Sequence, residues 1–267
     1  MALALVVVLL LITAASGYLM FSHTLFSQPL WFPAGASLVS GSVDHQFGQA
    51  MQLLGTMFVA AQVLLAAFLL LSWRRQRAKY HRGNNRLEIL WTVAIAIIFF
   101  GFNIAGAHAW TEMQVHHAKP GTMKIEVTGA QFQWYFRYAG TDGQFGRVDA
   151  QRFAKPEEGN ALGIDPGDAA GKDDVVSTVL VLPLDQDVEL ELRAQDVIHS
   201  LFIPAMRFKH DTVPGMIIPA PLRATKAGTY EIACAELCGT GHYRMHALVK
   251  VVSNQEFAVW LKSRSKQ

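Results

Sequence analysis

Residues 234–245 read CAELCGTGHYRM, and this stretch decides how the rest of the chain is interpreted. Its four soft metal ligands are Cys234, Cys238, His242 and Met245. A set of Cys, His and a weakly bound Met is typical of electron-transfer copper sites, and such ligands select copper over magnesium or calcium. The Cys-x3-Cys spacing lets both sulfurs face one point from a tight loop. Because two thiolates can bridge two copper ions, the stretch predicts a binuclear site.

A binuclear site needs a second imidazole from elsewhere in the chain. The best candidate is His199, in the strand-like run 196–204, although a buried histidine can also be purely structural. Three alternatives stay open for the cysteines: a Cys234–Cys238 disulfide in an external compartment, a zinc site that leaves the methionine idle, and a nucleophilic cysteine paired with His242. Covalent haem is excluded because the sequence has no Cys-x-x-Cys-His motif.

Short β-rich runs with period-two alternation surround this loop and predict an external all-β sandwich or barrel over residues 111–253. The predicted strands are Met123–Thr128, Phe132–Tyr138, Val175–Leu182, Val188–Leu192, Val197–Ile203, Gly228–Ala233 and Leu248–Val252. The stretch 140–174 is rich in Gly, Pro and Asp and predicts a long surface excursion between strands. Residues 254–267 form a predicted C-terminal helix and tail with Asn254 as the N-cap. The side chains expected to pack inward from this helix are Phe257, Val259, Trp260 and Leu261.

The first half of the chain predicts membrane segments. With 51% hydrophobic and only 16% charged residues, the chain is poorer in charge than ordinary soluble proteins. The runs 48–73 and 89–110 contain no charged residue, and each reaches the roughly 20 residues that cross a bilayer. Six of the 23 Lys and Arg residues lie in the connecting loop 74–87, which the positive-inside rule places in the cytoplasm. We therefore expect a transmembrane helical hairpin over 48–110, an external β domain, and no nucleic-acid surface.

The hydrophobic segment 1–21 has two interpretations. An apolar run that ends in small residues is typical of a cleaved signal peptide, but the positive N-terminal region of such peptides is missing. A retained third helix is the other interpretation, and the one we favour. Both place residues 22–47 in an external loop.

Four motifs in this order resemble subunit II of cytochrome c oxidase, over roughly residues 48–252. They are Gln133-Trp-Tyr-Phe136, Asp196-Val-Ile-His199-Ser, Lys209-His-Asp-Thr-Val-Pro-Gly215 and the Cys-x-Glu-x-Cys-Gly-x-x-His-x-x-Met loop. The resemblance implies a cupredoxin domain with a binuclear copper centre of the CuA type. The chain departs from the family pattern at three positions: Phe136 replaces a second Trp, Leu201 an aromatic residue, and Met216 an Arg.

The resemblance also implies a role for each candidate site residue. The copper ligands would be two bridging cysteines, two histidines, a weak methionine and one backbone carbonyl, namely Cys234, Cys238, His199, His242, Met245 and Glu236. The Glu236 side chain would also bind a magnesium ion shared with the catalytic subunit. Trp134 would be the residue through which an electron enters from cytochrome c. Glu88 would lie at the mouth of a proton pathway, although an acid at a helix N-terminus also suits the helix dipole.

These features predict the electron-accepting subunit of a bacterial oxidase in the inner (plasma) membrane, with its C-terminal domain on the periplasmic face. Electrons would come from an external cytochrome c-type donor and pass to haem in catalytic subunit I, which reduces oxygen to water and supports proton translocation. This chain would hold no haem. Its partners would be subunit I, other oxidase subunits and the donor, alone or within a respiratory supercomplex. The alternatives are a copper-free structural subunit of a quinol oxidase and a membrane-tethered copper-binding module.

Overall fold

The computed structural model describes residues 2–21, 33–73, 80, 82–114, 121–153 and 159–265. The chain divides into two units. One contains Met1–Pro33 and Ser42–Glu112, and the other contains Ala34–Gly41 and Met113–Gln267. The first unit is helical and the second is rich in β-strands.

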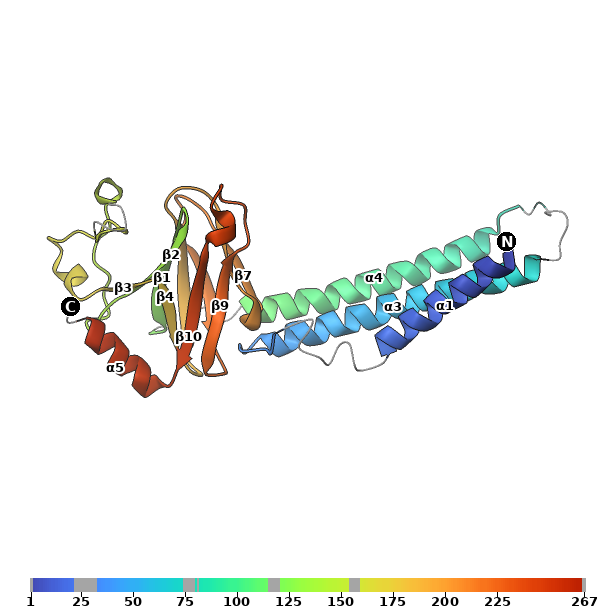
Figure 1. Ribbon diagram of the computed structural model, residues 1–267, viewed down its shortest axis with the longest axis horizontal. Coiled ribbons are helices and arrows are strands. Elements are labelled where there is room, and N and C mark those ends of the chain that lie inside the picture. The colour runs from blue at the N-terminus through green and yellow to red at the C-terminus, as the bar shows by residue number, and fades with distance from the viewer. Residues whose placement is uncertain are drawn as a thin grey trace. The chain divides into compact units, whose positions relative to one another are not determined.

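Helices α1 Ala2–Phe21, α3 Ser40–Ser72 and α4 Asn85–Gln114 account for the helical unit (Figure 1). Of these, α3 and α4 are long and apolar enough to cross a membrane, as the hairpin prediction requires. Helix α1 is the extra N-terminal helix, and both a signal peptide and a retained membrane helix would have this conformation. The three helices and the β domain that follows confirm the predicted fold class.

Both long helices begin before the apolar runs that predicted them. Residues 40–47 are helical, because the Ser40 amide and hydroxyl both donate to the Ser37 carbonyl and start the first turn. Helix α4 begins at Asn85, since the Asn84 side chain accepts hydrogen bonds from the amides of the next turn. The loops predicted over 22–47 and 74–87 therefore end earlier than expected, because the helix after each of them begins earlier. Residues 22–32, 74–79 and 81 lie outside the described residues.

The second unit is a β-sandwich of two five-stranded sheets (Figure 1). One sheet has the order β3-β2-β1-β5-β8, with bounds β1 Met123–Ala130, β2 Gln133–Tyr138, β3 Val175–Ser177, β5 Asp187–Ala194 and β8 Ile218–Arg223. The other has the order β4-β10-β9-β6-β7, with bounds β4 Val179–Pro183, β6 His199–Ile203, β7 Phe208–Thr212, β9 Gly228–Cys234 and β10 His246–Val252. Buried apolar side chains from both sheets form one continuous core between them.

The sequence did not predict strands β7 and β8, and it predicted β3 and β4 as one strand. Strands β7 and β8 are edge strands, which tolerate charge and proline because one side of the ladder is unpaired. They read FKHDT and IPAPLR, so neither has the apolar alternation of a buried strand. The predicted strand Val175–Leu182 divides at Thr178, where the chain leaves one sheet and enters the other. The Ser177 hydroxyl bonds both the amide and the carbonyl of Val179 at this crossing.

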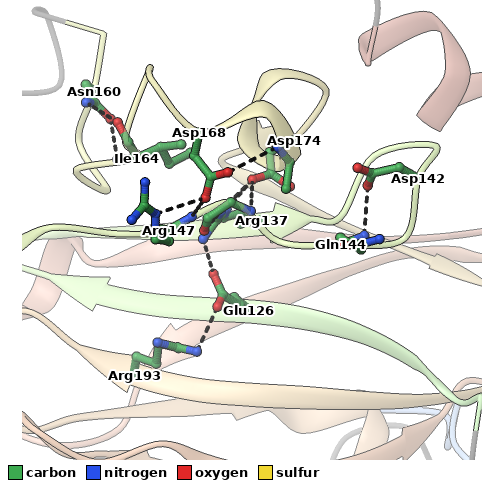
Figure 2. Close-up of polar contacts among 12 residues, drawn as sticks. Glu126, Arg137, Asp142, Gln144, Arg147, Asn160, Ile164, Asp168, Asp174 and Arg193 are labelled. Carbon is green, nitrogen blue, oxygen red and sulfur yellow. Dashed lines mark hydrogen bonds and ion pairs between the residues drawn. The ribbon is translucent and has the colours of Figure 1, made fainter.

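The stretch 140–174 was predicted as a surface excursion between strands, and its described parts contain turns, one isolated bridge and the 3-10 helices η1 Ala150–Arg152 and η3 Ala169–Lys172. Figure 2 shows how a buried ion network fastens the excursion to the sheet. Arg137 of β2 donates to Glu126 of β1 at 2.8 Å and through Nε to Asp174 at 3.0 Å. Arg193 of β5 donates to the same Glu126 at 2.7 Å. The side chains of Arg137, Glu126 and Asp174 are buried, whereas Arg193 is half-buried, and the network joins the excursion to strands β1, β2 and β5 of the sheet.

The C-terminal helix α5 Asn254–Arg264 has its N-cap one residue earlier than predicted. Ser253 is the N-cap and forms a capping box with Glu256, so the prediction of Asn254 as the cap is wrong. Phe257 is buried, and Trp260 and Leu261 pack against the core. Val259 was also expected to pack inward, but it is 70% exposed because it lies on the outer face of the helix.

The segment 34–41 is part of the β unit although it precedes both membrane helices in sequence. Its backbone pairs with η4 (Pro204–Met206) and with the end of β8, through Ala36 N to Ala205 O at 2.7 Å and Leu38 N to Arg223 O at 3.0 Å. Ala36 is fully buried there. The β domain is therefore assembled from two separate pieces of the chain.

Candidate metal centre

Two neighbouring strands and one loop supply the candidate ligands. His199 is the first residue of β6 and Cys234 is the last residue of β9, and these strands pair directly, with Leu201 opposite Cys234. The loop after β9 closes through the Cys234 amide, which donates to the Met245 carbonyl at 3.1 Å. A 3-10 turn, η5 His242–Arg244, brings the end of the loop back to β10. The fold thus gathers residues 199, 234 and 245 at one end of the sandwich.

The donor atoms of the loop converge on one point. The Sγ atoms of Cys234 and Cys238 are 3.8 Å apart, and neither cysteine is in a disulfide. His199 Nδ1 lies 4.0 Å from Cys234 Sγ, and His242 Nδ1 lies 3.5 Å from Cys238 Sγ. Met245 Sδ lies 3.7 Å from Cys238 Sγ. Each cysteine therefore has its own imidazole, and both sulfurs face each other, so the disulfide alternative is not realised here.

A backbone carbonyl completes this donor set. The Cys234 thiol donates to the Glu236 carbonyl oxygen at 3.1 Å. The Glu236 side chain is exposed, in contrast to the buried sulfurs. Glu236 is thus placed so that its carbonyl faces the sulfurs while its carboxylate is available to a ligand outside the chain.

The centre is shielded from water. His199 and Met245 are fully buried, and both cysteines are buried, whereas His242 is half-buried. Burial, with the neighbouring Cys234 as a second cause, raises the pKa of the Cys238 thiol to about 11. Without a metal the sulfur is therefore protonated at neutral pH, and metal binding must displace the proton because thiolates are the ligands.

Asp196 orients the imidazole of His199. Its carboxylate oxygen lies 2.8 Å from His199 Nε2, which leaves Nδ1 to face the sulfur of Cys234. Burial works to raise the pKa of Asp196, but hydrogen bonds from the Gln131 amide and from His199 hold it below its usual value. In the sequence, Asp196 is recognisable only as part of the motif Asp196-Val-Ile-His199-Ser. The Asp-x-x-His spacing was the available signal for its role, since it places the carboxylate just before the strand that carries the ligand.

Trp134 lies beside the centre, but it is not at the surface. It is fully buried, and its ring makes an edge contact with the His199 ring, with centroids 5.9 Å apart. Its Nε1 has no hydrogen-bond partner among the described residues. In this chain by itself the indole is not exposed to solvent, because β2 and the core enclose the side chain. The contact with a ligand ring nevertheless places Trp134 next to the candidate ligands.

Glu88 belongs to the other unit and lies in the first turn of α4, where its side chain is exposed. Its carboxylate is close to the α4 N-terminus, as the helix-dipole interpretation requires. The candidate metal centre thus brings together the residues predicted as copper ligands, with Trp134 as a neighbour, whereas Glu88 belongs to the other unit.

These donors fit copper better than a hard cation. The ligand atoms of His199, Cys234 and Cys238 lie within 4.8 Å of one another. The Met245 sulfur and the His242 imidazole adjoin them. Thiolate, thioether and imidazole suit Cu and Zn rather than Mg or Ca. A zinc site would leave the buried Met245 sulfur without a role, whereas a pair of copper ions uses every donor.

The chain is similar to several known proteins. The family "Cytochrome C oxidase subunit II, periplasmic domain" matches residues 123–252. "Alternative cytochrome c oxidase subunit 2" of Bradyrhizobium diazoefficiens is 32% identical over 97% of this chain and 91% of its own length. "Cytochrome c oxidase subunit 2" of Cereibacter sphaeroides is 28% identical over 78% of this chain and 70% of its own length. A solved periplasmic domain of subunit II from Bradyrhizobium japonicum is 28% identical and covers 54% of this chain and 94% of its own, with a TM-score of 0.39.

Proposed function

Because the chain belongs to the cytochrome c oxidase subunit II family, we propose that it accepts electrons at a binuclear copper centre and passes them to haem in the catalytic subunit. The family makes the chain a subunit of a haem-copper oxidase, an enzyme of the respiratory chain. The donor that we propose is an external carrier of the cytochrome c type. Oxygen chemistry and proton translocation belong to the partner subunit.

The observation that supports this proposal is the convergence of two free, buried thiols with two imidazoles and a thioether. Two copper ions that share both thiolates can take up and return one electron with little change in geometry. Cys234 and Cys238 would bridge the ions, and His199 and His242 would each bind one. Met245 would be a weak ligand, and the Glu236 carbonyl would complete the set.

The protein's own residues do three things for such a centre. Strands β6 and β9 hold His199 and Cys234 in fixed register, which limits rearrangement when the charge changes. Asp196 holds the His199 ring in one orientation, as partners of metal-bound histidines generally do. The buried core around the sulfurs excludes water.

Three further roles are part of the proposal. The exposed Glu236 carboxylate would bind magnesium at the interface with the catalytic subunit, since carboxylates suit that ion. Trp134 would conduct the electron to His199. Glu88 would serve the mouth of a proton pathway, and its place at the start of α4 agrees equally well with a role in helix stability alone.

We place the chain in the bacterial inner membrane, with the loop before α4 in the cytoplasm and the β domain in the periplasm. Cysteine labelling in intact cells tests this topology. A cysteine introduced at Gly83 should be protected from an impermeant reagent, and one at Gly167 should be labelled. The opposite pattern would contradict the proposed orientation.

The central test is metal analysis of the purified oxidase. We expect two copper ions per copy of this chain and an electron paramagnetic resonance signal from one electron shared between them. Cys238→Ser should abolish that signal, because a hydroxyl is a poor bridging ligand at neutral pH. One copper per chain with a localised signal would refute the binuclear centre, and a copper-free active complex would favour the structural subunit of a quinol oxidase. A complex that binds copper in this chain but shows no turnover with a cytochrome c-type carrier would favour the copper-binding module.

A further inference from the structure

We propose that Gln131 and Phe132, which form the turn between β1 and β2, are positioning residues that join the two ligand loops of the metal centre. This inference rests on the proposed function, because it concerns how the same centre is held. Neither residue is a candidate ligand. Their contacts nevertheless reach both parts of the chain that supply ligands.

Gln131 makes one hydrogen bond to each ligand segment. Its backbone amide donates to Asp196 Oδ2 at 2.7 Å, and the other oxygen of that carboxylate faces His199 Nε2. Its side-chain Nε2 donates to the Cys238 carbonyl oxygen at 2.5 Å. A single residue therefore connects the segment that orients one imidazole to the residue that carries a bridging sulfur.

Phe132 packs against the glycines that follow Cys238. A Cβ on Gly241 would lie 2.3 Å from a carbon of the Phe132 ring, and a Cβ on Gly239 would lie 3.2 Å from that ring and 2.8 Å from Gln131 Nε2. Gly239 also has a φ of +131°, which side chains rarely adopt. The Gly-Thr-Gly sequence after Cys238 thus lets the ligand loop lie directly against the turn.

The other backbone contacts of the loop to the rest of the domain lie near its strand ends, where the Ala235 amide donates to the Ser200 carbonyl at 3.0 Å. Its first and last residues are tied by the Cys234–Met245 backbone bond, whereas Cys238 lies midway between them. The bond from Gln131 is a tertiary contact to this midpoint. We therefore expect this side-chain bond to fix the direction of the Cys238 sulfur, and the bond from the Gln131 backbone amide to Asp196 to fix the ring plane of His199. Both features determine how charge is shared between two bridged copper ions.

The experiment uses the purified oxidase with Gln131→Ala and compares it with Gln133→Ala. Gln133 is a matched control because its side chain has the same chemistry and donates to its own strand, at the Trp134 carbonyl, rather than to a ligand loop. We expect Gln131→Ala to change the copper hyperfine pattern and the reduction potential, and to speed copper loss to a chelator about tenfold or more, as loss of an outer partner typically does. Gln133→Ala should match the unsubstituted protein.

A second substitution separates positioning from general stability. Gln131→Glu places a carboxylate opposite the Cys238 carbonyl, so it should change the copper hyperfine pattern at least as strongly as Gln131→Ala does. The thermal unfolding temperature of the copper-free protein should stay unchanged. Copper spectra and retention that are the same in all three variants and the unsubstituted oxidase would overturn the inference while leaving the proposed function intact. An unsubstituted oxidase without copper in this chain would overturn both.

Discussion

At the residue scale, Gly129 limits how the imidazole of His199 can be placed. A Cβ at this position would lie 2.9 Å from His199 Cδ2 and 3.1 Å from Trp134 Cζ3. Both rings are fully buried, so neither can move aside freely. We expect Gly129→Ala to displace the histidine, weaken copper retention and cost about 1–3 kcal/mol of stability, as overpacking does.

The control for Gly129→Ala is Gly167→Ala, where the nearest atom to a new Cβ is 3.4 Å away and belongs to a flexible side chain. Copper content and chemical denaturation of the two variants are the measurements. Equal copper content and stability in both would show that the histidine tolerates the extra methyl group.

Trp134 is the second residue at this scale, and its burial changes how its role must be tested. Truncation to alanine would cost about 3–5 kcal/mol and obscure any effect on electron transfer. Trp134→Phe keeps an aromatic ring beside His199 and loses an Nε1 group that has no partner among the described residues. We expect this variant to retain copper but to oxidise the carrier more slowly, because a phenyl ring is a poorer electron conductor than an indole.

Stopped-flow reduction by the carrier at measured copper occupancy is the test for Trp134→Phe. Phe136→Leu is the control, since Phe136 is also fully buried on β2. If both variants slow the reduction equally, Trp134 serves the core and does not conduct the electron.

Met245 tests the weakest of the proposed ligands. Its sulfur is buried 3.7 Å from Cys238 Sγ, so a leucine of similar volume should fill the same space. Since a weakly bound thioether tunes the potential of a copper site more than it holds the metal, Met245→Leu should retain both copper ions and shift the reduction potential. A redox titration measures the shift, and loss of copper would show instead that the thioether is needed for binding.

At the element scale, the capping box of α5 predicts a local effect far from the metal. The Ser253 hydroxyl accepts from the Glu256 amide, and the Glu256 carboxylate accepts from the Ser253 amide at 2.9 Å. Ser253→Ala should cost about 0.5–2 kcal/mol and loosen Trp260, whose ring lies 4.9 Å from that of Tyr138. Tryptophan fluorescence during denaturation reports this change, and Ser263→Ala in the last turn is the control. An unchanged midpoint for Ser253→Ala would contradict the prediction.

The same capping box has a defined pH dependence. Hydrogen bonds from the Ser253 hydroxyl and amide lower the pKa of Glu256 from its usual 4.5. A lowered pKa in the folded state means that the stabilisation is present above pH 4.5 and is lost as the pH falls through the lower value. The Ser253→Ala effect should therefore shrink in acid, which denaturation at pH 7 and at pH 3 would reveal.

The elements that could be predicted from sequence are those whose pattern is local. Strands β1 and β5 show apolar alternation and β2 is a short aromatic run, and the sequence located all three within two residues at each end. Strands β7 and β8 could not be found this way, because their charged residues and prolines give these edge strands the composition of a loop. The break at Thr178 was also invisible, since Val175 and Leu182 are both apolar although they lie in different sheets.

The candidate site was predictable for a related reason. Five of the six predicted ligands lie within twelve residues, so their closeness could be predicted from spacing. The sixth, His199, was predicted as the second imidazole from its place in a strand-like run, and the pairing of β6 with β9 brings it to the loop. Asp196 and Gln131 act through contacts between segments distant in sequence, and only the folded arrangement reveals them. The burial of Trp134 is likewise a property of both sheets together.

At the scale of the whole molecule, the β domain is discontinuous, because residues 34–41 reach it before the chain enters α3 and α4. Four hydrogen bonds fix this segment. Besides the two bonds of Ala36 and Leu38 to residues 205 and 223, the Thr225 amide donates to the Ala36 carbonyl at 2.8 Å, and the Ser37 hydroxyl donates to the Met206 carbonyl at 2.7 Å. Their loss would leave partner groups in the core without hydrogen bonds.

A soluble fragment that starts at Met113 should therefore fold as a sandwich but be less stable than the domain in the intact chain. At roughly 0.5–1.5 kcal/mol per hydrogen bond, the four bonds together contribute about 2–6 kcal/mol. Joining residues 34–41 to the fragment through a flexible Gly/Ser linker should recover most of this difference, as measured by urea denaturation. The same linker with Ala36→Glu is the control, because a charge cannot enter the fully buried Ala36 site without a partner. If the fragment without residues 34–41 is as stable as the linked one, the segment does not stabilise the domain. The membrane-anchored and soluble forms of the copper domain should then bind metal with equal affinity.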